Sequence, residues 1–227
     1  IIMKKIEDIL FIVQGRVNSK RVSQKMIRDF CGTTLFDIAI DKVLDSKIIP
    51  KENFYVSIYD TELKDIAKQK GVNIYNRSYE SANNDNSLQT IYEWHDKLPF
   101  KYVVKINGCS PLLKTKTIDN FVKQFLEQEE ENLFGVIQMN DYFFNKDNEL
   151  VTPWPENQTI MNTKAVESTY KAAHCLYASK MDIISENRFM GNFEDGEIKL
   201  YVLDELECFD IDYEWEFKVG ELLWSNQ

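Results

Sequence analysis

The sequence predicts an α/β fold whose sheet is mostly parallel. Short apolar runs alternate with amphipathic stretches of helical periodicity along the first 140 residues, a pattern that is typical of βαβ units. The alternation then stops, and an aromatic, polar and irregular segment occupies residues 140–175. We therefore expect a single domain over residues 1–227, with residues 140–175 inserted in it as an arm.

Five strands are expected in the regular part of the chain, each a short run of apolar and β-branched residues. They are residues 8–14, 54–59, 72–77, 101–107 and 133–139. Four helices alternate with them and are indicated by apolar residues at helical spacing. They are residues 33–46, 61–71, 87–98 and 116–131. Gly71 closes the second of these helices, because glycine readily adopts the left-handed conformation that ends a helix.

The remaining segments are less regular. Residues 78–86 are rich in Ser, Asn and Asp, which predicts a loop. Regular structure resumes at residues 174–185 and 199–205, and residues 208–224 read as a short strand that runs into a helix. In open α/β sheets, ligands bind beyond the carboxyl ends of the strands, so the polar loops that follow strands are candidate binding loops. These loops are residues 15–25, 77–87 and 107–111.

The composition excludes several classes of protein. The formal net charge is −10, whereas nucleic-acid binding needs a broad basic surface, so nucleic acid is not an expected partner. No apolar run approaches the roughly 20 residues that cross a bilayer, so membrane insertion is not expected. Four scattered cysteines and two histidines exclude a disulfide framework, a zinc ribbon and a histidine-rich metal site. We expect a cytoplasmic enzyme with reduced thiols.

Four cations lie in the first candidate loop, GRVNSKRVSQK. Backbone N–H groups and cations at the end of a strand can bind a polyphosphate. Arg16, Lys20 and Lys25 would then neutralise a triphosphate and its pyrophosphate leaving group. The same residues also fit a basic, solvated loop, and the glycine patterns of P-loop and dinucleotide-binding proteins are absent.

Asp210 and Asp212 form the second candidate motif. In an extended segment their carboxylates lie on one face, roughly 6–7 Å apart, and such a pair together with substrate phosphates suits Mg²⁺. The acidic alternation continues through Glu214 and Glu216, so the stretch also fits an edge strand with one solvated face. It also matches the D-x-D motif of a glycosyltransferase, although its position at the extreme C-terminus counts against that interpretation.

Together these stretches resemble the cytidylyltransferase family that includes the acylneuraminate cytidylyltransferases (CMP-sialic acid synthetases) and the spore-coat polysaccharide cytidylyltransferases. The resemblance extends over essentially the whole chain and rests on motifs that follow the family's order. They are Arg16-Val17-Asn18-Ser19-Lys20-Arg21 with Lys25, Ile58-Tyr59-Asp60, Arg77-Ser78 with Asn86-Ser87, Asn107-Gly108-Cys109-Ser110-Pro111-Leu112, and Phe209-Asp210-Ile211-Asp212.

The resemblance implies a Rossmann-like, three-layer fold, a homodimer formed through the arm, and the binding of CTP with Mg²⁺. The catalytic residues that it implies are Arg16, Lys20 and Lys25. The nucleotide-binding residues that it implies are Gly15, Arg16, Asn18, Ser19, Lys20, Arg21, Lys25, Arg77, Ser87, Asn107 and Gly108. The acceptor-binding residues that it implies are Ser110, Lys171, His174 and Tyr177, and the implied Mg²⁺ ligands are Asp210 and Asp212.

The chain departs from the family pattern mainly where the nucleobase and the acceptor are expected. Ser23 stands in place of the usual Pro, Met26 in place of Asn, and Leu113 in place of Arg. Asn107-Gly108 replaces Gln-Pro, and Cys109 stands where the ketodeoxyoctonate enzymes carry Asp. The phosphate and metal motifs therefore follow the family more closely than the acceptor side does.

The function that we expect is CTP-dependent transfer of CMP to a small acidic acceptor, with release of pyrophosphate. The expected acceptor is sialic, legionaminic or pseudaminic acid. A phosphonate or phosphorylated small molecule, used to decorate a surface polysaccharide, is the alternative acceptor. A nucleotide-sugar glycosyltransferase and a non-catalytic nucleotide-binding module are alternatives from other classes.

Overall fold

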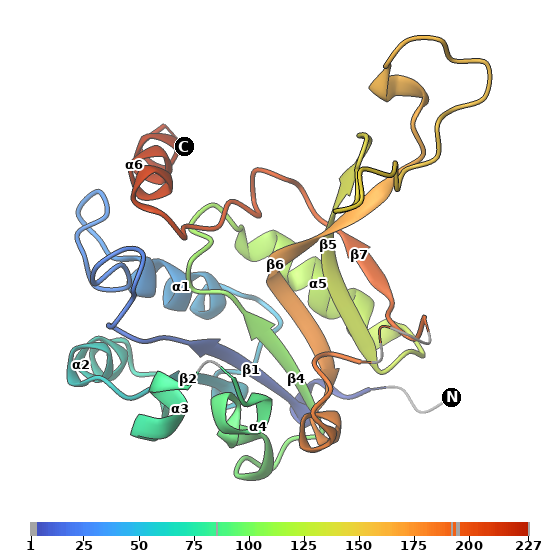
Figure 1. Ribbon diagram of the computed structural model, residues 1–227. Coiled ribbons are helices and arrows are strands. Elements are labelled where there is room, and N and C mark those ends of the chain that lie inside the picture. The colour runs from blue at the N-terminus through green and yellow to red at the C-terminus, as the bar shows by residue number, and fades with distance from the viewer. Residues whose placement is uncertain (1–3, 85, 192, 194–195, 227) are drawn as a thin grey trace.

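A seven-stranded sheet forms the centre of the computed structural model, which describes residues 4–84, 86–191, 193 and 196–226. Its strand order is β3-β2-β1-β4-β6-β5-β7 (Figure 1). The strands are β1 (Ile9–Gln14), β2 (Phe54–Ile58), β3 (Asn73–Asn76), β4 (Tyr102–Ile106), β5 (Asn132–Met139), β6 (Thr169–Lys180) and β7 (Leu200–Val202). β6 runs antiparallel to both β4 and β5, and the other neighbouring strands are parallel. The prediction of a mostly parallel sheet is confirmed.

Helical segments cover both faces of the sheet, which gives three layers. The α-helices are α1 (Leu35–Leu44), α2 (Thr61–Lys70), α3 (Tyr79–Asn83), α4 (Leu88–Ile91), α5 (Thr115–Glu127) and α6 (Glu214–Trp224). Residues of α1, α2, α5 and α6 pack in the larger core, which contains Phe11. On the other face, Leu10 and Ile12 pack with Trp94 of the 3-10 helix η3 (Glu93–Asp96) and Ile184 of η5 (Asp182–Glu186). Alternate residues of a strand point to opposite faces, so a strand buried on both faces is apolar throughout.

Local sequence signals account for most element boundaries. Each end of the five predicted strands lies within one residue of the observed strand end. Thr34 accepts a hydrogen bond from Asp37 N at the start of α1, and Gly71 ends α2 with a φ of +67°. None of the helices in the described ranges has the length and hydropathy of a membrane-spanning helix.

The segment between β3 and β4 differs from the prediction. Residues 79–83 form α3 and not a loop, with Ser78 accepting a hydrogen bond from Ser81 N as the helix cap. Residues 87–98 do not form a single helix, because Tyr92 (φ −109°, ψ +42°) interrupts it between α4 and η3. Tyr92 and Trp94 are both buried, and a regular helix would point residues two positions apart in different directions.

The short strand predicted just before α6 is wrong. Cys208 lies in a turn and residues 209–212 join no strand, because backbone groups of this stretch bond elsewhere. Ile211 N donates to Cys109 O at 3.0 Å, and Ile211 O accepts a hydrogen bond from Lys25 Nζ at 2.6 Å. The segment therefore crosses the turn that follows β4, and it brings its carboxylates to the carboxyl end of the sheet.

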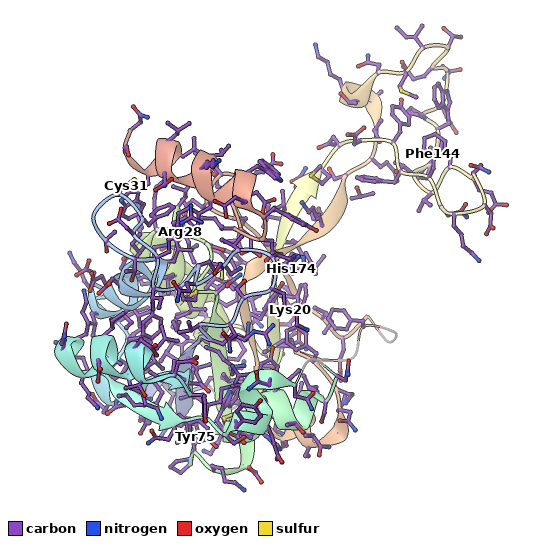
Figure 2. All side chains as sticks on the ribbon, turned by 60° about the vertical axis from the view of Figure 1, so that its left-hand side comes forward. Lys20, Arg28, Cys31, Tyr75, Phe144 and His174 are labelled. Atoms are coloured by element: carbon purple, nitrogen blue, oxygen red, sulfur yellow. The ribbon has the colours of Figure 1, made fainter. Side chains whose placement is uncertain are left out.

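Residues 140–168 leave the sheet between β5 and β6 and project from the body of the protein (Figure 1). They contain a short 3-10 helix, η4 (Thr163–Ala165). Residues 169–175, which we expected to belong to the arm, form the first half of β6 instead. Figure 2 shows Phe144 far out on this arm. The large apolar residues exposed along it are Phe143, Phe144, Val151, Trp154, Ile160 and Met161.

β6 contains a large bulge opposite β5. The single residue Gly135 of β5 lies opposite residues 173–176 of β6, and His174 within the bulge has a φ of +60°. A Cβ added to Gly135 would lie 2.6 Å from a backbone oxygen of β6, so only glycine allows this approach. Bulges change the direction in which side chains point, and this one sets the direction of His174.

A lysine in α1 makes the stability of the protein depend on pH. Lys42 Nζ donates a hydrogen bond to Ser110 O at 2.6 Å, and burial lowers the pKa of Lys42 from 10.5 to about 7. Between pH 7 and pH 10.5 the unfolded chain therefore binds more protons at this site than the folded protein does. The contribution of Lys42 to the free energy of unfolding accordingly rises with pH across this window.

We expect Lys42→Met to increase the free energy of unfolding more at pH 6 than at pH 9, by about 2–3 kcal/mol. The measurement is denaturant-induced unfolding of wild type and variant at both pH values. Lys68→Met, which changes a lysine whose side chain is 67% exposed on α2, is the matched control and should show no such pH dependence. An equal difference between Lys42→Met and wild type at both pH values would contradict the lowered pKa.

Candidate active site

A cleft of about 590 Å³ lies at the carboxyl ends of the central parallel strands. Ligands of open α/β sheets bind in this position. The described residues that line it are Gln14, Gly15, Arg16, Ser19, Lys20, Arg21, Lys25, Met26, Arg77, Asn84, Ile91, Tyr92, Lys105 and Cys109. Those expected from the sequence to bind the nucleotide are Gly15, Arg16, Ser19, Lys20, Arg21, Lys25 and Arg77. Asn18 lines a smaller cavity of about 170 Å³ beside it, together with Asn83.

Contacts with β2, α2 and α3 hold the basic loop, residues 15–25, at this cleft. Gly15 N donates to a carbonyl of β2 at 3.1 Å, and Val17 N donates to Asp60 Oδ2 at 2.9 Å. Arg16 Nη1 donates to a carbonyl of α3 at 3.3 Å. Asp60 therefore positions the loop, and the loop places its cations along one side of the cleft.

Lys25 connects the basic loop to the segment that precedes α6. Its Nζ donates to Ile211 O at 2.6 Å and lies 3.2 Å from Asp212 Oδ1. Arg21 Nη2 lies 2.8 Å from the same carboxylate oxygen. Burial by itself would lower the pKa of Lys25, but the neighbouring Cys109 and two carboxylates outweigh burial and raise it. Lys25 is therefore a cation at neutral pH, and it lies against an anion.

The two aspartates of the C-terminal motif share one site. Asp210 Oδ1 accepts a hydrogen bond from Asn107 Nδ2 at 3.3 Å. Burial, and then the charge of Asp212, raise the pKa of Asp210, so the pair carries repulsion that a bound cation would relieve. Carboxylates of this kind suit Mg²⁺ when substrate phosphates complete its ligand shell. Within the described ranges no cluster of three or more His, Cys, Asp or Glu side chains that could hold a metal ion is found.

The turn after β4 contacts the segment that carries these aspartates. Asn107 Oδ1 accepts a hydrogen bond from Cys109 N at 2.9 Å, and a Cβ added to Gly108 would lie 2.8 Å from Met26 Cε. Neither Asn107 nor Gly108 is among the residues that line the cleft. Ser110, expected to bind the acceptor, is buried away from the cleft, and its Oγ has no hydrogen-bond partner among the described residues.

Arg77 reaches the cleft from the end of β3. Its Nε donates to Ser81 Oγ at 2.8 Å, and its Nη2 donates to Ser81 O at 2.5 Å. Burial, and then the nearby Arg16, lower the pKa of Arg77 to about 10. Ser87 does not line the cleft; its Oγ caps α4 by accepting a hydrogen bond from Thr90 N.

The three expected acceptor-binding residues on β6 lie outside the residues that line the cleft. Lys171 is exposed, and Tyr177 is buried with its hydroxyl 3.3 Å from His174 Nδ1. Figure 2 shows His174 near the base of the arm. The charge of His174 also acts on Asp210 and opposes the rise of its pKa, so His174 lies close to the carboxylate pair.

Several cleft residues were not anticipated from the sequence. They are Gln14, Met26, Asn84, Ile91, Tyr92, Lys105 and Cys109. Two of them carried a usable signal, since Gln14 and Lys105 are polar residues near the carboxyl ends of otherwise apolar strands. Gln14 is held by Trp94, whose Nε1 donates to Gln14 Oε1 at 2.9 Å.

Comparisons with known proteins identify the family of this chain. A family model described as cytidylyltransferase matches residues 10–216. Post-translational flagellin modification protein B of Campylobacter coli is 23% identical, covering 95% of this chain and 94% of its own. CMP-N,N'-diacetyllegionaminic acid synthase of Campylobacter jejuni is 25% identical, covering 96% of this chain and 95% of its own.

A solved structure supports the fold independently of sequence identity. CMP:2-keto-3-deoxy-manno-octonic acid synthetase in complex with CTP is similar with a TM-score of 0.70 at 11% identity, over 96% of this chain and 99% of that one. At that identity the likeness shows the shared Rossmann-like fold. Because the family model spans most of the sequence, this chain belongs to the cytidylyltransferase family and is a nucleotidyltransferase.

Proposed function

We propose that this enzyme transfers CMP from CTP to a 2-keto acid sugar of the sialic, legionaminic or pseudaminic acid type and releases pyrophosphate. The observation that carries the proposal is the pairing of two cleft-lining cations of the basic loop, Arg21 and Lys25, with Asp212, which lies beside the cleft but is not among its lining residues. A protein of net charge −10 concentrates positive charge there, and a cleft of one sign attracts ligands of the opposite sign. The relative named as a legionaminic acid synthase supports this class of acceptor.

In this proposal the basic loop binds the triphosphate, with Arg16, Lys20 and Lys25 neutralising its charge. The acceptor hydroxyl gives its proton to solvent and its oxygen attacks the α-phosphorus in line, while the bond to the bridging oxygen breaks and pyrophosphate leaves with the electron pair. Lys25 stabilises the charge that grows on the leaving group. Because Ile211 O and Asp212 hold Lys25 in place, little reorganisation is needed during the reaction.

Asp210 and Asp212 are the residues that would hold Mg²⁺. When bound, this ion supplies further neutralisation of the phosphate oxygens. Asp212 has a second role in the chain itself, because its carboxylate aligns both Arg21 and Lys25. The proposal places the enzyme in the cytoplasm, where CTP is available.

A phosphonate or a phosphorylated small molecule is the second candidate acceptor. It is favoured by the turn after β4, where Asn107-Gly108 replaces the Gln-Pro of the family pattern and Cys109 stands where the ketodeoxyoctonate enzymes carry Asp. The family match favours nucleotidyl transfer over the glycosyltransferase alternative. The deciding experiment measures pyrophosphate release with each of the four ribonucleoside triphosphates against sialic, legionaminic and pseudaminic acids, ketodeoxyoctonate and phosphonates. Release with CTP and only a phosphonate would keep the reaction and replace the acceptor.

We also propose that the protein is a homodimer and that the arm, residues 140–168, forms its interface. Phe144, Ile160 and Met161 are 59–67% exposed on it, and exposed apolar surface of this kind marks protein interfaces.

We expect Lys25→Met to lower kcat/KM about 100- to 1,000-fold, because a fixed cation at the growing charge is lost. Methionine keeps most of the side-chain volume, so thermal unfolding should change little. The measurement is pyrophosphate release with CTP, and Lys68→Met is the control that alters charge without touching the cleft. Wild-type turnover in Lys25→Met would show that the basic loop is a solvated surface loop without a role in catalysis.

Asp212→Asn should leave the fold intact, lower turnover about 100-fold or more, and raise the Mg²⁺ concentration that gives half-maximal rate. Asparagine can still accept hydrogen bonds from Arg21 and Lys25, so a loss of turnover would report the missing negative charge alone. Glu214→Gln, which removes the neighbouring carboxylate paired with Arg28, is the matched control. An unchanged Mg²⁺ dependence in Asp212→Asn would remove the metal role.

For the proposed dimer, light scattering at micromolar concentration should give a mass of twice 26.7 kDa. The double substitution Ile160→Ser with Met161→Ser should shift the mass toward that of one chain, because it removes apolar surface from the arm. A wild-type mass of one chain would disprove the dimer.

A further inference from the structure

Lys105 is a cation that rises from the middle of the sheet into the cleft. Its neighbours in β4, Val104 and Ile106, are buried in the larger core. Because side chains of a strand alternate, Lys105 lies on the opposite face, where it is partly buried and lines the cleft. Its Nζ lies 5.9 Å from the centre of the Tyr92 ring, so an aromatic side chain flanks the ammonium group.

Lys105 differs from other cations of the cleft in its partners. Arg21 and Lys25 pair with Asp212, and Arg77 donates to Ser81. In the described part of the chain, Lys105 forms no ion pair with a carboxylate. Partly buried charges are normally paired, so a ligand with negative charge is the natural partner for Lys105.

The position of Lys105 distinguishes it from the cations of the basic loop. Arg16 is tied to α3 and Lys25 to the segment before α6. Lys105 instead lies directly across from Tyr177 of β6 in the antiparallel pair with β4. It therefore faces the part of the cleft nearest to β6, whereas the loop cations come from the end of β1. Lys105 therefore offers a positive charge at a different place in the cleft from the cations of the basic loop.

We propose that Lys105 binds the acid group of the acceptor, a carboxylate, a phosphonate or a phosphate, and so holds the acceptor oxygen ready for attack on the nucleotide. The inference rests on the proposed function, in which an acidic acceptor shares the cleft with CTP. Lys105 also makes two anions compatible in one cleft, because its charge offsets their mutual repulsion.

The test measures acid binding without requiring turnover. The protein is saturated with the α,β-methylene analogue of CTP and titrated calorimetrically with N-acetylneuraminic acid, ketodeoxyoctonate, 2-aminoethylphosphonate and inorganic phosphate. For the acid that binds wild type, Lys105→Met should weaken binding about 10- to 100-fold, as expected for the loss of a hydrogen bond between charged groups. Lys105→Arg should restore most of the affinity, and affinity for the CTP analogue should change less than about twofold in both variants.

Lys101→Met is the matched control, since Lys101 precedes the same strand but is exposed and paired with Asp8. It should leave acid binding unchanged. Weaker binding of the CTP analogue to Lys105→Met, with acid binding intact, would assign Lys105 to the nucleotide and overturn the inference. Failure of every acid to bind wild type would overturn it as well. Pyrophosphate release is measured separately. Unchanged turnover in Lys105→Met would keep the proposed function and reject this inference. Acid binding that depends on Lys105, without any turnover, would keep this inference and reject the proposed function.

Discussion

The contact between Lys25 and the segment before α6 is the interaction on which the site depends. Lys25 bonds to Ile211 O and to the Asp212 carboxylate, which lie 186 and 187 positions further along the sequence. A partly buried lysine and a pair of close aspartates are each unfavourable alone, because desolvated charges need partners. Together they neutralise one another where the basic loop meets the segment before α6. The basic loop and the carboxylates are therefore brought together by the same ion pair.

The turn after β4 determines how the remaining parts meet. The Asn107 amide donates to His174 O in the β6 bulge and to Asp210 Oδ1. Cys109 O accepts a hydrogen bond from Ile211 N, and Gly108 leaves room for Met26. One short turn thus contacts the basic loop, β6 and the C-terminal segment. The turn is also one of the places where the chain departs from the family pattern that it resembles.

Positive charge is concentrated in the cleft of an otherwise acidic protein. The net charge of −10 keeps the general surface unattractive to anions, while the cleft gathers cations from the basic loop, β3 and β4. Field lines concentrate in such a cleft because its walls have a low dielectric constant. Under the proposed function, these cations would offset the repulsion between a triphosphate and an acidic acceptor.

Residue pattern was sufficient for the parts of this protein whose structure depends on near neighbours. The strand Ile9–Gln14, the helix end at Gly71 and the cation-rich loop all follow from local periodicity, glycine conformation and side-chain charge. Contacts between distant segments were needed for the rest. The break at Tyr92 depends on packing in a core that is built from distant segments of the chain. Residues 208–212 form no strand because Cys109 and Lys25 take hydrogen bonds of their backbone. The role inferred for Lys105 likewise depends on its position relative to loop 15–25 and β6. The strand pattern shows which face of the sheet a side chain occupies, but not what lies opposite that side chain.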